Sequence, residues 1–284
     1  MNEVTIRVPA TTANLGPGYD CLGVALQIHN RVTVVRVSAS APASGSDAMA
    51  AAAAEKFFAA SGVTAFPFSW TITGEVPRAR GLGSSVTVRL GLLHGFNELA
   101  GGPLTRERLC ALCAELEGHP DNAAPAAFGG FTVAGGAGVA RFAVAPELRF
   151  VLLIPDFEIS TPAARRVLPA QLDRLAAAQS CAHACRITAA FAAQNYALLR
   201  GAFADQLHQP FREKALIPFL STVIAAGERA GALGGFLSGS GSTICCVTLE
   251  KSDAIAAAML AASGQTGARI VTTHADNTGA VVLP

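Results

Sequence analysis

The chain has few lysines and little charge of either sign. Asp, Glu, Lys and Arg make up 14% of the 284 residues, and the only lysines are Lys56, Lys214 and Lys251. The formal net charge is +1 at pH 7, and the basic residues form no stripe. Nucleic-acid binding depends on clustered Lys and Arg that neutralise phosphates, so we expect no nucleic-acid partner. Because 51% of the residues are apolar, a disordered chain is also excluded.

The chain also lacks a long apolar run and a secretory signal. Its longest alanine-rich run, residues 48–54, is far shorter than the roughly 20 apolar residues that span a bilayer. The N-terminus, MNEVTIRVPATT, alternates apolar and polar residues as a strand does. It has neither the charged nor the apolar region of a signal peptide. We therefore expect a cytoplasmic protein with no membrane partner.

Cysteine is present, but not in a metal-binding pattern. Cys110 and Cys113 form a C-x-x-C inside a helix-like run, RERLCALCAELEG. No second such pair and no histidine pair completes the four ligands of a structural zinc site. We predict that the seven cysteines are buried, reduced thiols.

Strand-like and helix-like segments are mixed along the chain, which predicts an α+β fold. Residues 84–100 and 172–201 are typical of helices, and 268–276 of a closing strand. The apolar run LRFVLLIPD, residues 148–156, predicts a buried strand that opens a second half. We therefore expect two domains, at residues 1–150 and 151–284.

Two glycine loops are the first candidates for a site. In PRARGLGSS, residues 77–85, a glycine turn precedes a helix, and such a turn exposes backbone N–H groups that bind phosphate. The loop does not match the Walker pattern, whose lysine it lacks. A tight turn with Ser84 as helix N-cap is the alternative. The second loop, LSGSGST at residues 237–243, can place more backbone against the same ligand or serve as a plain turn.

Acidic and amide side chains gather in ELEGHPDN, residues 115–122. Phosphoryl transfer needs a carboxylate for Mg²⁺ and a group that positions the attacking hydroxyl. Glu115 or Glu117 can serve the metal, and Asp121 the hydroxyl. In the alternative interpretation Asp121 caps the next turn and His119 bonds to backbone.

Four motifs in one order resemble those of the GHMP small-molecule kinases, which include galactokinase, homoserine kinase and mevalonate kinase. They are VPATTANLGPGYDCLGVAL, PRARGLGSS, LEGHPDNAAPAAFGGF and LSGSGST. ANLGPGYD, EGHPDN, TPAARRVLP and HQPFREKALIP are similar to the homoserine kinases in particular. The resemblance runs from about Val8 to about Thr248.

The resemblance implies both a fold and a reaction. The fold has an N-terminal ATP-binding domain with a left-handed β-α-β crossover, and a ferredoxin-like C-terminal domain that contributes to the substrate site. The reaction moves the γ-phosphoryl of ATP to the hydroxyl of L-homoserine, a step of threonine biosynthesis, and needs Mg²⁺. A homodimer is compatible with it.

The resemblance also assigns roles to individual residues. Catalysis falls to Asp121 and Asn122, and the metal to Ser85 with Glu117 or Glu115. The ATP loop comprises Pro77, Arg80, Gly81, Leu82, Gly83, Ser84 and Ser85. The substrate residues are Asn14, Asp20, His119, Thr161, Arg165 and Arg212.

Two departures from the family pattern bear on the choice of substrate. Residues 86–89, VTVR, replace the small alanines that usually follow the loop, and Ser180 and His183 replace an asparagine and an arginine. These departures keep two alternatives open. One is a kinase of another small hydroxyl compound, such as threonine or a related amino alcohol. The other is a non-catalytic sensor on the same fold.

Overall fold

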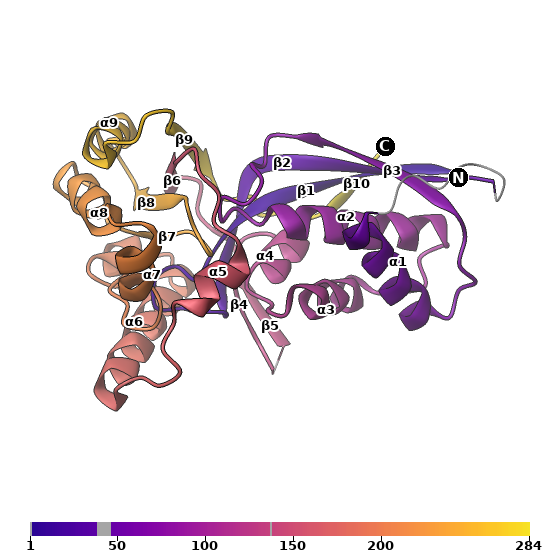
Figure 1. The fold of residues 1–284 in the computed structure, drawn as a ribbon, viewed down its shortest axis with the longest axis horizontal. Coiled ribbons are helices and arrows are strands. Elements are labelled where there is room, and N and C mark those ends of the chain that lie inside the picture. Colours follow the sequence, from indigo (N-terminus) through magenta and orange to yellow (C-terminus); the bar gives the residue numbers. More distant parts are fainter. Residues whose placement is uncertain (1, 39–46, 137) are drawn as a thin grey trace.

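Two antiparallel sheets, one of six strands and one of four, organise the described part of the chain (Figure 1). The computed structural model describes residues 2–38, 47–136 and 138–284. The larger sheet extends to the right in Figure 1 and the smaller lies to the left, each with its own helices.

The six-stranded sheet has the order β10-β1-β2-β4-β5, with β3 beside β2. Its strands are β1 (Glu3–Ala13), β2 (Leu22–Arg36), β3 (Phe68–Gly74), β4 (Phe131–Gly135), β5 (Gly138–Phe142) and β10 (Val281–Leu283). β1 and β2 pair over nearly their whole lengths, and Val4 and Ile6 lie opposite Val34 and Val32. These alternate β-branched residues are buried, so one face of the ladder carries the core.

Four helices pack on that buried face (Figure 1). They are α1 (Ala48–Ser61), α2 (Ser84–Leu99), α3 (Arg106–Glu117) and α4 (Ala123–Phe128). α2 approaches the sheet closely because it carries glycine at two facing positions. A Cβ on Gly91 would lie 2.6 Å from Val32, and one on Gly95 2.5 Å from Val34. This close packing fixes where the N-terminus of α2 lies.

The four-stranded sheet has the order β7-β8-β6-β9. Its strands are β6 (Arg149–Ile154), β7 (Gly234–Leu237), β8 (Ile244–Thr248) and β9 (Arg269–His274). Helices connect β6 to β7 and β8 to β9, which gives the β-α-β-β-α-β succession of a ferredoxin-like fold. The ferredoxin-like second half is thus confirmed. The helices are α5 (Thr161–Arg166), α6 (Arg174–Ala192), α7 (Gln209–Leu216), α8 (Leu220–Arg229) and α9 (Ser252–Ser263), with a 3₁₀ turn at Tyr196–Leu199.

A shared core joins the two sheets. Phe150 and Leu152 of β6 belong to one buried cluster with Leu22 of β2 and Phe131 of β4. Phe131 also stacks on Phe191 of α6, with ring centroids 4.2 Å apart. The loops of both halves are therefore held against one another by apolar packing.

The chain ends on the sheet where it began. β10 pairs with β1, and Ala275 bridges to Leu26 of β2. The Asp276 carboxylate lies 2.7 Å from Nε2 of His29 on β2. The closing strand is thus β10 and not residues 268–276, which form β9 within the second sheet. Local pattern cannot reveal this return, because only the partner strand makes Val281–Leu283 a strand.

The structure changes the bounds of other predicted segments. The helix expected at 172–201 ends at Ala192, and a 3₁₀ turn follows. β6 begins at Arg149, and the strand pairing of β10 crosses the division predicted at residue 150. The two-domain boundary and the left-handed crossover stay predictions of the resemblance.

Cysteine burial follows the prediction only in part. All seven thiols are free; Cys110, Cys113, Cys245 and Cys246 are buried and Cys21 partly so. Burial raises the pKa of Cys110 and of Cys246 to about 12, so both stay protonated at neutral pH. For Cys181 and Cys185 the prediction is wrong, because both are exposed on α6.

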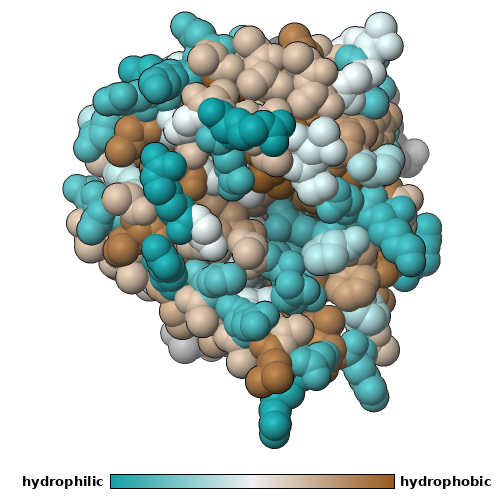
Figure 2. All heavy atoms as spheres, turned by 90° about the vertical axis from the view of Figure 1, so that its left-hand side faces the viewer, coloured by the Kyte–Doolittle hydropathy of each residue, from teal (hydrophilic) through white to brown (hydrophobic). Residues whose placement is uncertain are grey.

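Figure 2 looks onto the left-hand side of Figure 1, and hydrophilic and hydrophobic side chains are interspersed over this face. Among the described residues, no helix is long and apolar enough to cross a membrane.

Candidate active site

A cavity of about 570 Å³ is lined by residues from both halves of the chain. It brings together predicted residues that lie up to 198 positions apart in the sequence, from Asn14 to Arg212. The predicted site residues that line it are Asn14, Asp20, Gly81, Gly83, Ser84, Ser85, Glu117, His119, Asp121, Asn122, Thr161, Arg165 and Arg212.

The first glycine loop forms one wall of the cavity and leads into α2. Gly81 and Gly83 have φ of +74° and +69°, a conformation that glycine adopts without strain. Gly83 is the N-cap of α2 and supplies no capping side chain, so the alternative with Ser84 as N-cap is wrong. Within the described part of the chain, the first N–H groups of α2 have no hydrogen-bond partner and can bind a ligand, and the helix dipole favours an anion there.

The second glycine loop packs directly against the first. A Cβ on Gly81 would lie 2.1 Å from the Ser238 carbonyl oxygen. The Ser238 hydroxyl donates to the Gly81 carbonyl at 2.7 Å and lies 2.8 Å from the Thr12 hydroxyl. Gly239 and Ser240 reach the cavity. The two loops therefore form one backbone cradle, which no spacing in the sequence reveals.

Glu117 is the carboxylate that faces this cradle. Its Oε2 accepts a hydrogen bond from the Ser85 hydroxyl at 2.9 Å, and its side chain is only 8% exposed. A carboxylate and a hydroxyl side by side are oxygen donors of the kind that Mg²⁺ takes. Glu115 points elsewhere: it pairs with Lys56 at 2.7 Å and Arg108 at 3.2 Å, and does not line the cavity.

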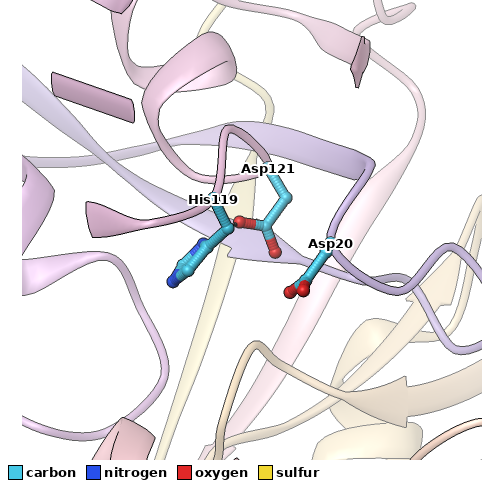
Figure 3. Close-up of side chains that lie close together, drawn as sticks. All are labelled: Asp20, His119 and Asp121. Carbon is cyan, nitrogen blue, oxygen red and sulfur yellow. Dashed lines mark hydrogen bonds and ion pairs between the residues drawn. The ribbon is translucent and has the colours of Figure 1, made fainter. Parts of the chain in front are cut away.

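Asp20, His119 and Asp121 converge at the other end of the cavity (Figure 3). One potential ligand atom from each lies within 4.8 Å of the others. Asp121 Oδ1 lies 2.5 Å from Nδ1 of His119 and accepts from the Asn122 amide at 3.2 Å. Figure 3 shows the second Asp121 oxygen on the side of Asp20. His119 thus bonds to a carboxylate and not to backbone, and Asp121 caps no helix.

Asn122 is held by the first strand, since the Thr11 hydroxyl donates to its side-chain oxygen at 2.7 Å. Burial alone would lower the pKa of His119, but the hydrogen bond and charge of Asp121 raise that pKa above its ordinary value. The His119–Asp121 pair is therefore a fixed unit whose orientation Asn122 and Thr11 support.

Two arginines face Asp20 across the cavity. Nη2 of Arg165 donates to both Asp20 carboxylate oxygens, at 2.8 and 3.0 Å. Arg212 is 2% exposed and donates to the Gly239 carbonyl at 2.8 Å. Both guanidinium groups lie 5.5 Å from the Tyr19 ring centroid. Two arginines beside an aspartate suit a ligand that carries both a carboxylate and an ammonium group.

His208 holds Arg212 in place. Its Nε2 donates to the Gly16 carbonyl at 2.8 Å, so its Nδ1 accepts from Nη1 of Arg212 at 3.1 Å. Burial lowers the pKa of His208 to about 4, so the ring is neutral as this bonding requires. The sequence analysis missed His208, although it lies one helical turn before Arg212 in HQPFREK.

Three predicted loop residues lie outside the cavity, together with Glu115. Arg80 donates to the Pro155 carbonyl and pairs with Asp156 and Glu158, so it ties the loop to the second half. Leu82 is fully buried in the shared core. Pro77 precedes the lining residues Arg78 and Ala79 but is not among them.

The far wall of the cavity was also missed. Trp70, Ile72 and Gly74 of β3 line it, together with Val76 and Val88. The period-2 alternation of FSWTITG is a signal that places Trp70 and Ile72 on one face. The wall adds apolar side chains to the same cavity as the backbone cradle.

Of the two departures from the family pattern, only residues 86–89 touch the site. Val86 and Val88 line the cavity. Ser180 accepts from the Gln206 N–H at 3.1 Å, and Nδ1 of His183 lies 2.8 Å from the Ala204 carbonyl oxygen. Ser180 and His183 therefore support the segment before α7 and do not shape the cavity.

An anion cradle, a buried carboxylate at its edge and an end lined by paired charges are the parts that a small-molecule kinase needs. Comparison with known proteins agrees: the family model for the GHMP kinases N terminal domain matches residues 44–130, and that for the GHMP kinases C terminal matches residues 187–265. The chain belongs to the GHMP kinases, and relatives that it matches along nearly its whole length include homoserine kinases.

Homoserine kinase of Synechococcus sp. is 39% identical over 93% of this chain and 92% of that protein. Homoserine kinase of Moorella thermoacetica is 37% identical over 98% of this chain and 99% of that protein. The crystal structure of homoserine kinase from Cytophaga hutchinsonii superposes with a TM-score of 0.89 at 23% identity, covering 100% of this chain and 98% of that one. The GHMP kinase fold and an ATP-dependent small-molecule kinase are thereby confirmed.

Proposed function

We propose that the chain transfers the γ-phosphoryl group of ATP to the hydroxyl of L-homoserine and gives O-phospho-L-homoserine. The observation that carries this proposal is a single cavity with a backbone anion cradle at Gly81–Ser85 and paired acid and arginine side chains at Asp20, Asp121, Arg165 and Arg212. The first end fits a triphosphate, and the second fits an amino acid.

The acceptor end orients the amino acid. Arg165 and Arg212 bind its carboxylate, and Asp20 binds its ammonium group. The ammonium group then replaces part of the hydrogen bonding that Arg165 gives to Asp20 in the absence of an amino acid. Asn14 supports Asp20, because its side-chain oxygen accepts from the Asp20 N–H at 2.9 Å. Thr161, the first residue of α5, completes this wall.

Asp121 positions the attacking hydroxyl. Its Oδ1 is occupied by His119 and Asn122, so the other oxygen is the one that accepts the hydroxyl proton. Phosphoryl transfer proceeds through a loose transition state, in which positioning and charge stabilisation do most of the work. Asp121 then removes the proton late, and His119 and Asn122 keep its carboxylate aimed at the hydroxyl.

The cradle binds the phosphates, and Ser85 and Glu117 would hold Mg²⁺. The fit rests on the buried Glu117 carboxylate, which hydrogen-bonds to the Ser85 hydroxyl at the cavity wall. When bound, the cation neutralises charge that develops on the phosphates. This chain's own contribution is the N-terminus of α2, whose N–H groups and helix dipole stabilise negative charge on the phosphates.

The test is release of ADP by the purified protein with ATP and Mg²⁺, and with L-homoserine, L-threonine, L-serine or no acceptor. We expect release that depends on L-homoserine, and a phosphate monoester of homoserine as the product. Faster release with another acceptor would replace homoserine in the proposal. Nucleotide binding without release in the presence of any acceptor would contradict transfer and favour a sensor.

A further inference from the structure

Arg89 pairs with Glu117, the carboxylate proposed to hold the metal. It lies one helical turn after Ser85 in α2, and its Nη1 is 2.5 Å from Oε1 of Glu117. The opposite oxygen of the same carboxylate, Oε2, accepts from Ser85 at 2.9 Å. Arg89 does not line the cavity, so it acts on the site only through Glu117.

Glu117 lies in a place where a carboxylate needs a counter-charge. It is the last residue of α3, whose final turn contains no basic side chain. The C-terminal end of a helix dipole disfavours negative charge, and an 8% exposed side chain loses most of its hydration. In α3 itself nothing offsets these costs. Arg89 comes from α2 and supplies the missing positive charge.

The pairing leaves the carboxylate with one oxygen for the cavity. A carboxylate has about four lone-pair sites, so Arg89 does not prevent Glu117 from ligating a cation. It fixes Oε1, and Oε2 is then the oxygen at the cavity wall beside Ser85. The adjacent guanidinium also repels a cation that approaches Glu117 without phosphates to balance it.

We infer that Arg89 is a positioning residue which restricts Glu117 to one metal-facing oxygen and lowers its affinity for a free divalent cation, so that the cation enters with the nucleotide. This inference rests on the proposed metal role of Glu117. It also gives a function to Arg89 as the one charged residue of segment 86–89, where the chain departs from the family pattern. The phosphates bring the negative charge that the Arg89–Glu117 pair lacks, and the site becomes favourable to the cation only in their presence.

The experiment measures Mn²⁺ binding without nucleotide, by the loss of the electron paramagnetic resonance signal of free Mn²⁺. Mn²⁺ takes the same oxygen ligands as Mg²⁺. We expect Arg89→Met to bind Mn²⁺ about tenfold more tightly than the wild type, because a unit charge near the cation is removed. Arg89→Gln, uncharged but still a hydrogen-bond donor, has the same expected result, and Arg89→Lys, which keeps the charge, should behave like the wild type.

Two controls separate this effect from a general change in charge or fold. Arg108→Met removes an arginine that pairs with Glu115 outside the cavity, and should leave Mn²⁺ binding unchanged. Arg89→Met with Glu117→Gln should lose the gain, because the carboxylate that causes it is gone. Melting temperatures show that each variant is folded.

Mn²⁺ affinity of Arg89→Met and Arg89→Gln within twofold of the wild type would overturn the inference. If the wild type still phosphorylates L-homoserine, the proposed function stands and only the role of Arg89 is lost. A gain that persists in the double variant would also overturn it, since the cation would then bind elsewhere. Absence of transfer by the wild type is a separate result and refutes the proposed function itself.

Discussion

Arg165 and Asp20 form an ion pair that joins the two halves of the chain at the cavity, with Nη2 to carboxylate distances of 2.8 and 3.0 Å. Their side chains are 39% and 32% exposed, so water screens the pair and it adds little to stability. The pair instead holds a guanidinium and a carboxylate at a fixed spacing before any amino acid binds.

Replacement of Arg165 should therefore weaken binding of the acceptor and leave binding of the nucleotide unchanged. Arg165→Met loses a charged hydrogen bond to the substrate carboxylate, a contact of about 1.5–3 kcal/mol, so we expect KM for L-homoserine to rise about 10- to 100-fold. KM for ATP should change less than twofold. Arg166→Met is the matched control, because Arg166 is the next residue, exposed and outside the cavity. An equal rise in both KM values would contradict the assignment.

Replacement of Asp121 should affect the chemical step. Asp121→Asn keeps the shape of the side chain but removes the proton acceptor, and such groups contribute about 10²- to 10⁴-fold to rate. We expect kcat to fall at least about 10²-fold while nucleotide binding persists. Asp156→Asn, at an exposed carboxylate that pairs with Arg80, should leave kcat unchanged. A kcat for Asp121→Asn within fivefold of the wild type would exclude Asp121 from proton transfer.

The parts of the site that sequence could predict are those encoded by local backbone chemistry. The glycines of residues 77–85 have to adopt positive φ before a helix, and Gly81 and Gly83 do so. Family motifs added Arg165 and Arg212, which no local pattern explains. What could not be predicted depends on distant partners. The choice between Glu117 and Glu115 as metal ligand depends on the packing of α3 against α2. This packing places the Glu117 carboxylate beside Ser85 and leaves Glu115 paired with Lys56.

The stability of the fold should depend on pH through the His119–Asp121 pair. The pKa of His119 is raised above 6.5, so the pair stabilises the folded protein fully below pH 6.5 and less as pH rises through the raised pKa. His94 and His208, whose pKa values burial lowers to about 4, act in the opposite direction, because the unfolded chain protonates them near pH 6.5 and the folded protein does not. The His119 contribution is therefore measured as a difference: the free energy of unfolding of the wild type minus that of His119→Gln, from urea titrations above pH 6.5, should fall as pH rises.

His119→Gln is the control for this pH dependence. It keeps a polar side chain near Asp121 but cannot gain or lose a proton, and it leaves His94 and His208 in place, so their effect cancels in the difference. A difference that does not change with pH would contradict a pH-dependent contribution of the His119–Asp121 pair.

A side chain at Gly81 should disrupt the contact between the two glycine loops. In Gly81→Ala the new Cβ would lie 2.1 Å from the Ser238 carbonyl oxygen, in addition to the strain of a φ of +74°. We expect loss of nucleotide binding and a lower melting temperature. Gly101→Ala isolates the strain, because Gly101 has a φ of +85° with no atom within 4 Å of the added Cβ. That control should cost only about 1–2 kcal/mol of stability and leave nucleotide binding intact. Equal effects of the two substitutions would argue against a functional cradle.

Trp70 gives a direct signal for the nucleotide end of the cavity. It is the only tryptophan of the chain, and it lines the cavity on β3, next in the period-2 pattern to Ile72. If the base of ATP lies against this apolar wall, stacking and exclusion of water will change the indole emission. We expect titration with ATP to change the fluorescence saturably, and L-homoserine alone to leave it nearly unchanged, because the acceptor end is formed by other elements.

Variants at the two ends of the cavity separate the causes of that signal. Gly81→Ala should abolish the ATP-dependent change, since the phosphates lose their cradle, whereas Arg165→Met should preserve it. Trp70→Ala should weaken ATP binding by about 2- to 10-fold, the value of one aromatic contact of roughly 0.5–1.5 kcal/mol. If ATP binds, as measured by calorimetry, but the Trp70 emission stays constant, then the base lies away from β3 and only the phosphate cradle fixes the nucleotide.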